Sequence, residues 1–368
     1  MAVFDRRVVY HFDWTVFVLA LLLAGVGVLS VFSATWGNSR QGLDPLVVRQ
    51  LTWVGIGALL MASTALLDYR SLNTYAYLFY AVTIVLLALV AVAGQSTGGS
   101  RRWISLGVMK LEPSELAKLA VALVMVRYLR EEPPRGGWNP RHIVVPGILL
   151  AVPAVLVLQQ PDLGTALILV LITATLIFVG GLNWRTGAAL VIGAMLAAPV
   201  AWHHLKPYQR ARMVSFLDPQ SDPLGSGYHI IQSEIAIGSG GTRGKGLFKG
   251  TQARLNFLPE QTTDFIFAVF AEEFGFAGSM LLLGLYTALI LRGTWIASHA
   301  RDRFGALLAV GVTGIIFWQV AINIGMASGM LPVVGITLPL VSYGGSSLIA
   351  MMAAIGVLIS INARRYLF

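Results

Sequence analysis

Ten long apolar stretches alternate with polar segments along the chain. They cover residues 14–34, 47–67, 73–94, 111–129, 143–159, 163–182, 186–203, 264–291, 304–328 and 346–362. Each is close to the ~20 residues that a helix needs to cross ~30 Å of hydrocarbon. Because backbone polar groups in lipid must be satisfied internally, the pattern predicts an all-α polytopic membrane protein with about ten transmembrane helices.

The composition supports a membrane protein and excludes some chemistry. Of the 368 residues, 56% are hydrophobic and 12% are charged, whereas soluble domains carry about a quarter charged residues. No cysteine is present, so disulfides, zinc thiolates and thiol nucleophiles are excluded. The net charge of +9 is explained by membrane topology and anionic lipid, without nucleic acid as a partner.

The distribution of lysine and arginine predicts the orientation. With a cytoplasmic N-terminus, the inner segments contain thirteen basic residues and the short outer loops contain five. The inner ones are Arg6, Arg7, Arg70, Arg127, Arg130, Arg135, Arg141, Arg185, Arg292, Arg301, Arg303, Arg364 and Arg365, and the outer ones are Arg40, Arg49, Arg101, Arg102 and Lys110. Both termini are therefore expected on the cytoplasmic side of the cytoplasmic membrane. The first apolar stretch lacks a small-residue cleavage site and is expected to remain as a span.

One long segment interrupts the alternation. Residues 204–263 separate the seventh and eighth predicted spans, so they form a long extracytoplasmic loop within a single transmembrane domain, 1–368. A loop of this length is usually functional or disordered, and we favour function. Its stretch "YHIIQSEIAIGSGG", 228–241, predicts a short amphipathic helix lying on the membrane.

The same loop contains the glycine-rich stretch "GSGGTRGKGLFKGTQ", 238–252. A phosphate-binding loop needs a glycine five residues before the Gly-Lys pair and a Ser or Thr after it, and this stretch has Ser239 and Gly246 there. Two interpretations remain open. Backbone N–H groups with Arg243, Lys245 and Lys249 can bind an anion, or the segment is a flexible basic loop that touches anionic headgroups.

The fourth predicted span begins with "LEPSELAKLA" and carries two charges. Glu115 and Lys118 are three residues apart, so they share one face of the helix. Ionisable groups at this depth face a bundle interior or a wet cavity and are functional candidates. The alternative is a structural ion pair that fixes helix packing.

Acidic residues also lie at the start of the eighth predicted span, in "LNFLPEQTTDFIFAVFAEEFG", 255–275. Thr262 or Thr263 is expected to cap the helix and Asp264 to fall in its first turn, where the helix dipole favours a carboxylate. Helix stabilisation is one interpretation of Asp264, and catalysis is the other. Glu272 and Glu273 lie two turns deeper, and we interpret both as structural residues, one of them paired within the bundle.

Two further stretches are predicted near the outer leaflet. "GGSRRWISLG", 98–107, is a glycine-flanked basic loop with Arg101 and Arg102, and "GMLPVVGITLPLVSYGGSSL", 329–348, is uncharged but broken by proline and glycine. Broken backbone at membrane depth is tolerated only inside protein or beside a cavity. These features predict an outward-facing site for a lipid-borne anion.

The residues narrow the chemistry of such a site. None of the six histidines is spaced with the acids as in a metal site, and no serine elbow, paired-acid signature or nucleotide motif occurs. An extracytoplasmic enzyme without ATP needs an activated substrate, such as a polyprenyl diphosphate sugar. Basic residues then stabilise the leaving diphosphate, and one carboxylate deprotonates the attacking hydroxyl.

Four stretches, in order, resemble the SEDS family of shape, elongation, division and sporulation proteins of the bacterial cell wall. They are "LEPSELAKLA", "QQPDLGTALIL", "GTQARLNFLPEQTTDFIFAVFAEEFGFAG" and "LPVVGITLPLVSYGGSSL". With the ten spans, the resemblance covers nearly the whole chain. "KGTQ" before "LPE", "AEEFGFAG" and the short termini resemble the RodA branch.

The resemblance implies a peptidoglycan glycosyltransferase for cell elongation that polymerises lipid II outside the cytoplasmic membrane. It implies a class B penicillin-binding protein and other elongation-complex membrane proteins as partners. The family's essential aspartate falls on Asp264, and its polar residues of the fourth span fall on Glu115 and Lys118. Relatives often have a histidine where this chain has Thr262, so no role of that histidine carries over.

Candidates for holding the diphosphate are basic residues on the predicted outer side. They are Arg101, Arg102, Arg212, Arg243, Lys245 and Lys249. A divalent cation, Mg²⁺ or Mn²⁺, is a further candidate for binding the diphosphate together with these residues.

Two other functions stay open at the level of sequence. A lipid II flippase would use the intramembrane Glu115 and Lys118 and the broken segment for substrate passage. A non-catalytic scaffold would only recruit the penicillin-binding protein, and Asp264 and Lys118 would then be replaceable.

Overall fold

The structure is a computed structural model that describes residues 10–36, 44–97, 100–105, 107, 110–134, 136–204, 206–223, 225, 227–255 and 257–365. Helices dominate it, as the sequence predicts. Each of the ten apolar stretches corresponds to a helix. They are α2 (Trp14–Ala34), α3 (Pro45–Leu66), α4 (Tyr69–Ala93), α5 (Pro113–Leu129), α6 (Pro140–Gln159), α7 (Leu163–Val179), α8 (Trp184–His204), α12 (Ile266–Ser298), α13 (Arg303–Ala327) and α14 (Gly345–Arg364).

Seven of these helices are long and apolar enough to cross a membrane, counted over the described residues. They are α2, α3, α4, α6, α12, α13 and α14. α5 and α7 have 17 residues each, and α8 is counted as an apolar helix only over its described stretch Trp184–Ala197. The chain is therefore a multi-pass membrane protein, and the count of ten spans stays a prediction for α5, α7 and α8.

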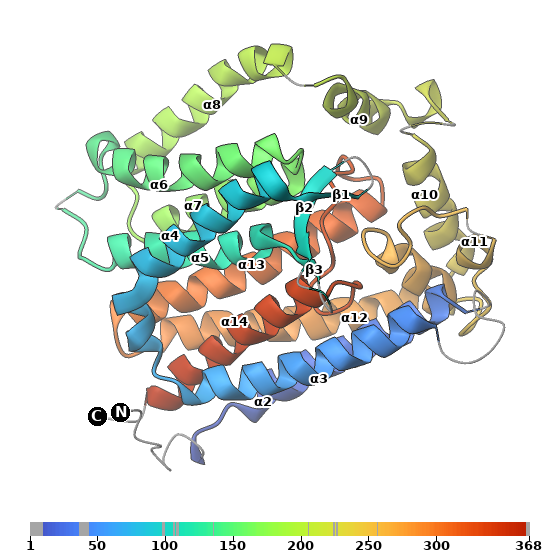
Figure 1. Ribbon diagram of the computed structural model, residues 1–368, viewed down its shortest axis with the longest axis horizontal. Helices are drawn as coiled ribbons and strands as arrows, with labels where there is room; N and C mark the ends of the chain where they lie inside the picture. The colour runs from blue at the N-terminus through green and yellow to red at the C-terminus, as the bar shows by residue number, and fades with distance from the viewer. Residues whose placement is uncertain are drawn as a thin grey trace.

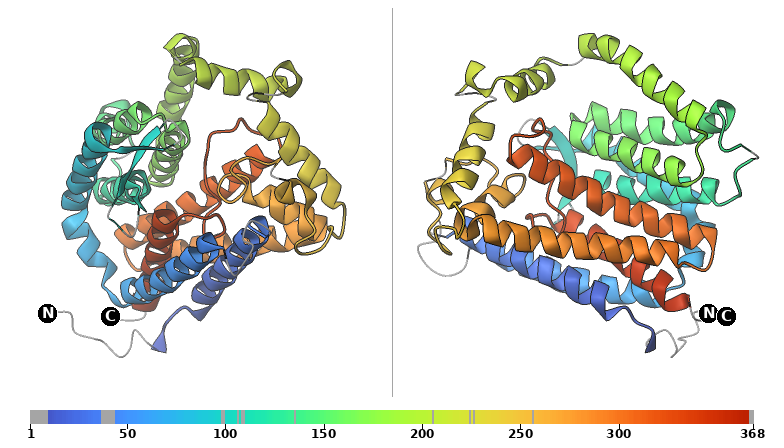
Figure 2. Two further views of the ribbon diagram at one scale, coloured as in Figure 1. Left: turned by 45° about the vertical axis from the view of Figure 1, so that its right-hand side comes forward. Right: turned by 180° about the vertical axis from the view of Figure 1, so that it is seen from behind.

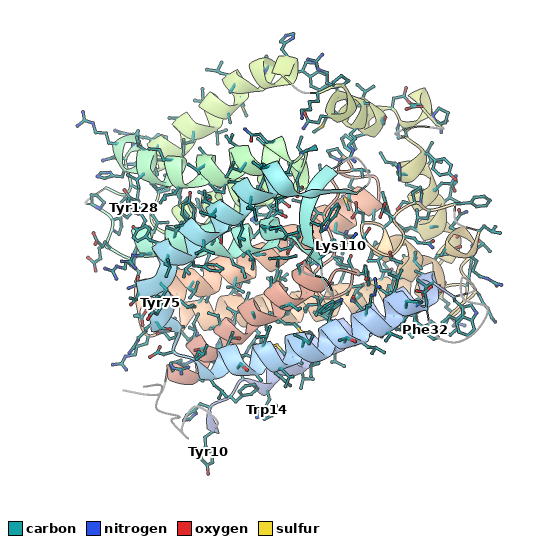
Figure 3. The ribbon with its side chains drawn as sticks, viewed as in Figure 1. Tyr10, Trp14, Phe32, Tyr75, Lys110 and Tyr128 are labelled. Atoms are coloured by element: carbon teal, nitrogen blue, oxygen red, sulfur yellow. The ribbon has the colours of Figure 1, made fainter. Side chains whose placement is uncertain are left out.

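The helices lie side by side in one bundle (Figure 1). The right-hand view of Figure 2 shows α13 and α2 on either side of α12. The most apolar windows of α13 and α14 are 72% buried, against 22% for α3, α4 and α6, so α13 and α14 form the centre. The exposed Trp14 lies at the end of the bundle where α2 begins. Phe32 lies at the opposite end of the same helix (Figure 3).

Aspartates start five of these helices. Their side chains accept hydrogen bonds from backbone N–H groups of the first turn, which satisfies donors that have no partner within the helix. These residues are Asp13 of α2, Asp44 of α3, Asp68 of α4, Asp162 of α7 and Asp302 of α13.

A small sheet lies between α4 and α5, where the sequence predicts only a basic loop. Strands β1 (Gln95–Thr97), β2 (Ser100–Ser105) and β3 (Lys110–Leu111) pair antiparallel in the order β1-β2-β3. Ser96 pairs with Arg101, and Ser105 pairs with Lys110. The sheet holds residues 100–105 in a fixed register beside the start of α5.

The long segment after α8 is structured over its described residues. It contains α9 (Pro207–Leu217), the 3₁₀ turn η1 (Pro219–Ser221), α10 (Tyr228–Gly240) and α11 (Thr251–Arg254). α8 and α9 run along the upper edge of Figure 1, and α10 and α11 lie at its right side. The predicted helix over 228–241 is confirmed as α10. It packs on α12 and α13, and Ser233 Oγ donates to the Ala327 carbonyl at 2.5 Å, while its position on the membrane surface stays a prediction.

We expect Gly356→Ala to lower the melting temperature of the detergent-purified protein. α14 packs closely on α3, and a Cβ atom at Gly356 would lie 2.3 Å from the Met61 carbonyl oxygen, which is backbone and cannot rotate away. Overpacking of this kind costs about 1–3 kcal/mol. The control is Gly284→Ala in α12, where a Cβ would meet nothing within 4 Å. Equal melting temperatures for the two variants would contradict the packing argument.

Candidate active site

Asp264 lies immediately before α12, between α13 and the broken segment that precedes α14. Its carbonyl oxygen accepts a hydrogen bond from Asn323 Nδ2 of α13 at 2.9 Å, and the same amide nitrogen donates to the Ile336 carbonyl at 2.6 Å. A Cβ on Gly335 would lie 3.4 Å from Asp264 Oδ2. Asn323 therefore fixes the backbone of the aspartate against residues 335–336.

The residues before Asp264 are held by the same broken segment. The Tyr343 N–H donates to the Thr262 carbonyl at 2.8 Å, and Ser342 Oγ donates to the Thr263 carbonyl at 2.5 Å. Ser342 Oγ also accepts from the Leu338 N–H at 2.8 Å. Residues 332–344 are irregular, and none of them is exposed, as broken backbone at membrane depth must be enclosed by protein.

The predicted threonine cap is wrong. α12 begins at Ile266, its N-cap is Phe265 without a side-chain cap, and Asp264 lies outside the first turn. Thr263 Oγ1 instead contacts Glu260, at 3.3 Å from its carbonyl oxygen and 3.2 Å from Oε2. Asp264 consequently does not cap a helix as the other five aspartates do, so its carboxylate is not used to bind backbone N–H groups of α12.

The surroundings of Asp264 change its proton affinity. Burial raises the pKa of the Asp264 carboxyl to about 6, and the Glu260 carboxylate acts in the same direction. Arg212, Arg102 and the Thr263 hydroxyl act to lower the pKa. Asp264 as a residue is half-buried, so it is largely enclosed but not sealed inside the protein. Such a group is ionised at pH 7 and more basic than an ordinary aspartate.

Arg102 links Asp264 to a second group of charges. Its guanidinium donates to the carbonyls of Gln160, at 3.3 Å, and Pro161, at 2.5 Å, and pairs with Asp162 at 3.7 Å. β2 and the turn between α6 and α7 thereby hold Arg102 within electrostatic reach of Asp264. Arg212 reaches Asp264 from α9. The side chain of the neighbouring candidate, Arg101, lies outside the described part of the structure.

Glu115 and Lys118 share one face of α5, as predicted. Lys118 Nζ lies 2.7 Å from Glu115 Oε2, and both side chains are buried. Glu112, just before α5, is within electrostatic reach of both, and also of Arg102 and Asp162. Its backbone N–H donates to Ser346 Oγ at 3.2 Å. The structure thus gathers Glu112, Glu115, Lys118, Asp162 and Arg102 into one charged group that reaches Asp264 through Arg102.

The glycine-rich loop lies elsewhere and has a structural partner. α12 is broken at Gly275, whose φ is 65°. The N–H groups of Lys245 and Gly246 donate to the carbonyls of Glu272 and Glu273 at 3.0 and 2.9 Å, and those of Phe276 and Ala277 donate to Gly241 and Thr242 at 2.8 and 3.1 Å. The backbone of this loop therefore repairs the broken helix, and these N–H groups do not form an anion site.

The side chain of Lys245 also binds at the break of α12. Lys245 Nζ lies 2.6 Å from Glu272 Oε1, which further accepts from the Thr251 N–H at 2.8 Å. Glu273 accepts from the Ser33 hydroxyl of α2. The expectation that one of the two glutamates pairs within the bundle is confirmed for Glu272. Lys245 as a diphosphate ligand stays a prediction, and its ammonium already neutralises a buried carboxylate.

Arg243 and Lys249 are exposed on the same loop. Arg243 lies within residues 241–246, which pair with the α12 break around Glu272 and Gly275, and Lys249 lies three residues after them. Glu272 follows Asp264 by eight residues, about 12 Å along a helix. Both basic residues belong to the rim of the region, and the structure does not bring them to the aspartate as it does Arg102 and Arg212.

Sequence reasoning missed several residues of this region. Glu112 and Asp162 lie at the ends of predicted spans, Glu260 is the acid of "LPE" but was given no role, and Asn323 lies in no quoted motif. His229 of α10 stacks on Phe265 with ring centroids 6.0 Å apart. Burial and the charge of Arg212 lower the pKa of its imidazole, while Glu260 acts to raise this pKa. Glu112 and Asp162 could have been found from the sequence, because each is an acidic residue at the end of a predicted span. Within the described residues, no group of three or more His, Asp or Glu could hold a metal ion.

The chain matches one protein family over nearly its full length. The model of the FtsW, RodA and SpoVE cell cycle proteins matches residues 13–367. Among curated relatives, the peptidoglycan glycosyltransferase MrdB of Escherichia coli K12 is 44% identical over 360 residues, which cover 96% of this chain and 94% of that protein.

Solved structures agree. A chain from a peptidoglycan synthase complex, described for its coordination of polymerization and crosslinking, matches with a TM-score of 0.83 at 38% identity, covering 97% of this chain and 99% of that one. The rod shape determining protein RodA of Thermus thermophilus matches with a TM-score of 0.72 at 32% identity, covering 97% and 98%.

We expect Lys245→Ala to destabilise the protein by about 2 kcal/mol, because it leaves a charged Glu272 buried beside the break with one donor fewer. The double variant Lys245→Ala with Glu272→Gln should recover part of this loss, since the remaining amide needs no counter-ion. Thermal unfolding in detergent measures both.

Arg243→Ala is the matched control for this experiment, because it removes the same charge from the same loop at an exposed position. Its effect should stay within about 0.5 kcal/mol. Equal destabilisation by Lys245→Ala and Arg243→Ala would show that Lys245 has no special structural role.

Proposed function

The chain belongs to the FtsW, RodA and SpoVE family of cell cycle proteins, and we propose on this premise that it polymerises lipid II with Asp264 as the general base. It is a peptidoglycan glycosyltransferase, and its relatives with this activity are similar to it along nearly its whole length. Its role is in cell elongation and rod shape. The observation that carries the assignment of Asp264 is its geometry: a largely enclosed but unsealed aspartate that caps no helix and lies within reach of two arginines.

The reaction then follows from the residues in place. The acceptor sugar hydroxyl binds at Asp264, and the carboxylate takes its proton as the oxygen attacks the anomeric carbon of the growing glycan. The bond from that carbon to the diphosphate oxygen breaks, and undecaprenyl diphosphate leaves with the electron pair. Attack from the face opposite the leaving group inverts the carbon and gives a β-1,4 linkage.

Arginines of the region stabilise the charge that develops on the leaving group. Arg102 and Arg212 are the first candidates, because both act electrostatically on Asp264. Guanidinium groups suit phosphate oxygens through their paired N–H donors. Arg101, Arg243 and Lys249 remain candidates for the outer part of the diphosphate, and a divalent cation bound with the diphosphate would supply the same neutralisation.

Glu115 and Lys118 complete the substrate site in this proposal. Their buried ion pair lies in the charged group that Arg102 connects to Asp264. Lys118 would present a positive charge to the lipid-linked diphosphate, with Glu115 holding its ammonium in place.

The proposed membrane setting follows the distribution of basic residues. The protein lies in the cytoplasmic membrane as one domain, 1–368, with both termini cytoplasmic and Asp264 open to the extracytoplasmic side. The segment 204–263 is then the long outer loop. A class B penicillin-binding protein is the proposed partner, supported by the similarity to a chain of a synthase complex that polymerises and crosslinks. Other elongation-complex membrane proteins are expected around this pair.

The test is glycan polymerisation by the purified protein with its cognate penicillin-binding protein and lipid II, with and without divalent cation. We expect polymer from the wild type and a loss of about 10²-fold or more with Asp264→Asn, which keeps the shape of the side chain but cannot take a proton. Polymer from both would contradict Asp264 as base. No polymer from either, with labelled lipid crossing vesicles, would favour a flippase. No polymer and no transport, with the partner bound, would favour a scaffold.

The pH dependence of polymerisation gives an independent check. A general base works only when deprotonated, and burial with Glu260 raises the pKa of Asp264 to about 6. The rate should therefore be level above about pH 7 and fall about tenfold per pH unit well below 6. Glu260→Gln removes one cause of the rise, so it should move this acid limb to lower pH. An acid limb near pH 4 in the wild type would contradict the raised pKa.

A further inference from the structure

A pair of adjoining hollows lies at the other end of the bundle, far from Asp264. The first, of about 500 Å³, is lined by residues from the starts of α4 and α13 and the end of α5: Arg70, Asn73, Arg130, Glu131, Asp302, Arg303 and Phe304. Arg303 begins the helix that carries Asn323, and twenty residues separate them, about 30 Å. The hollow therefore lies on the opposite side of the membrane from the proposed catalytic site.

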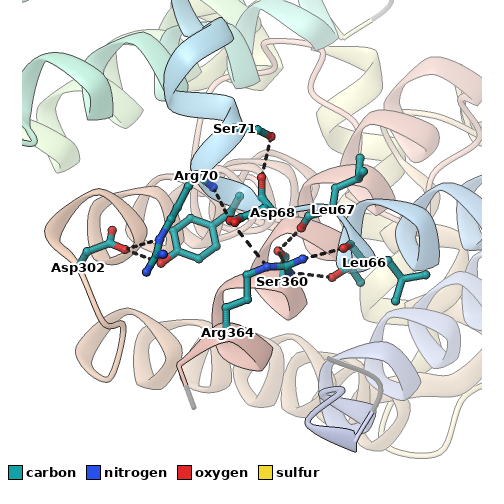
Figure 4. A network of polar contacts seen from close by, with 10 residues as sticks. Leu66, Leu67, Asp68, Arg70, Ser71, Asp302, Ser360 and Arg364 are labelled. Carbon is teal, nitrogen blue, oxygen red and sulfur yellow. Dashed lines mark hydrogen bonds and ion pairs between the residues drawn. The ribbon is translucent and has the colours of Figure 1, made fainter. Parts of the chain in front are cut away.

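The hollow has more positive than negative charge available to a ligand. The Asp302 carboxylate already has three partners within the protein. It accepts hydrogen bonds from the Gly305 N–H at 2.7 Å and the Tyr69 hydroxyl at 2.5 Å, and it pairs with Arg70 at 3.5 Å (Figure 4). Arg70 keeps an exposed side chain, at 47%. Arg130 is exposed and has no ion pair within the described residues.

Arg303 is a positioned donor. Its Nε donates to the Leu129 carbonyl at 3.1 Å and one terminal nitrogen donates to the Gly180 carbonyl at 2.7 Å. These carbonyls end α5 and α7, so the guanidinium is fixed on two helix ends. Asn73, also in the lining, has a buried side-chain oxygen without a hydrogen-bond partner among the described residues. Buried amide oxygens normally accept a hydrogen bond, so this one lacks a donor.

The second hollow continues the first through Arg130 and Glu131, which line both. It adds one further arginine, one further carboxylate and several rings: Tyr77, Arg127, Tyr128, Glu132, Pro134, Trp138 and His142. The Arg127 guanidinium lies 4.5 Å from the centre of the Tyr77 ring. Nearby side chains of α4 and α6 are apolar and exposed, with Leu78 at 62% and Ile148 at 58%. Arginine and aromatic rings beside an exposed apolar surface are typical of the headgroup level of a membrane.

We propose that these hollows bind the phosphodiester headgroup of an anionic phospholipid from the inner leaflet. Arg130 and Arg303 would hold the phosphate oxygens, and Asn73 would meet a headgroup hydroxyl, such as that of phosphatidylglycerol. The acyl chains would follow the apolar surfaces of α4 and α6. The leaflet rests on the orientation proposed above, whereas the binding chemistry does not depend on glycan polymerisation.

The test uses the full-length protein, delipidated in detergent and incubated with equal amounts of phosphatidylglycerol and phosphatidylethanolamine of identical acyl chains. Native mass spectrometry counts the retained lipids. We expect phosphatidylglycerol to be retained preferentially and Arg130→Ala to reduce its binding about tenfold, the effect of one charge-assisted hydrogen bond. Arg130→Lys should restore part of the binding, because it restores the charge without the paired donors.

Arg185→Ala is the matched control, because it removes the same charge from the predicted cytoplasmic side at the start of α8, outside both hollows. It should leave phosphatidylglycerol binding within twofold. Equal losses for the Arg130 and Arg185 variants, or equal retention of the two lipids by the wild type, would overturn the proposal. Soluble glycerol phosphate at millimolar concentration should not displace the lipid, and displacement would overturn the membrane source. None of these readings uses glycan polymerisation, so their failure is distinct from failure of the proposed enzyme function.

Discussion

The break of α12 at Gly275 is the constraint on which the arrangement of α10, α11 and the glycine-rich loop depends. A helix broken at membrane depth leaves N–H and C=O groups that hydrocarbon cannot satisfy. Residues 241–246 satisfy four of them with their own backbone. Such close approach needs glycine, since a Cβ at Gly244 would lie 2.0 Å from the Glu273 carbonyl oxygen. The long loop is therefore part of the α12 fold, and Glu272 with Lys245 holds it there.

This arrangement separates Asp264 from ordinary helix chemistry. Five other aspartates satisfy the N–H groups at helix starts, whereas Asp264 precedes an N-cap that has no side-chain bond. Asn323 and the irregular residues 335–343 fix its backbone instead. The carboxylate itself contacts only the Thr263 side chain among the causes that act by hydrogen bonding. Partial enclosure makes it a stronger base than an exposed aspartate, which suits the general base proposed above.

The two ends of the bundle have different tasks. The end with Asp264 collects charges from β2, α5, α9 and the turn before α7, and it is where we propose chemistry on a lipid-linked diphosphate. The opposite end ties helices together through Arg364, Asp68 and Ser360 (Figure 4). It also offers Arg130 and Arg303 beside an apolar surface. The same helices, α5 and α13, contribute to both ends, so rigid elements connect the two regions.

The sequence by itself determined the helices, since apolar length and turn residues are local properties. It also determined that Glu115 and Lys118 share a face, because helical spacing fixes that relation. The small sheet and the missing threonine cap were decided by tertiary contacts, as the start of α12 is set by residues 335–343 and Asn323. Neither of the two interpretations left open for the glycine-rich loop included its pairing with α12. The N–H groups of Lys245 and Gly246 have partners 27 residues away in the chain, at Glu272 and Glu273, and no local pattern reveals whether a donor faces solvent, a ligand or a carbonyl. Only the folded chain decides which of its polar groups are already satisfied and which remain for function.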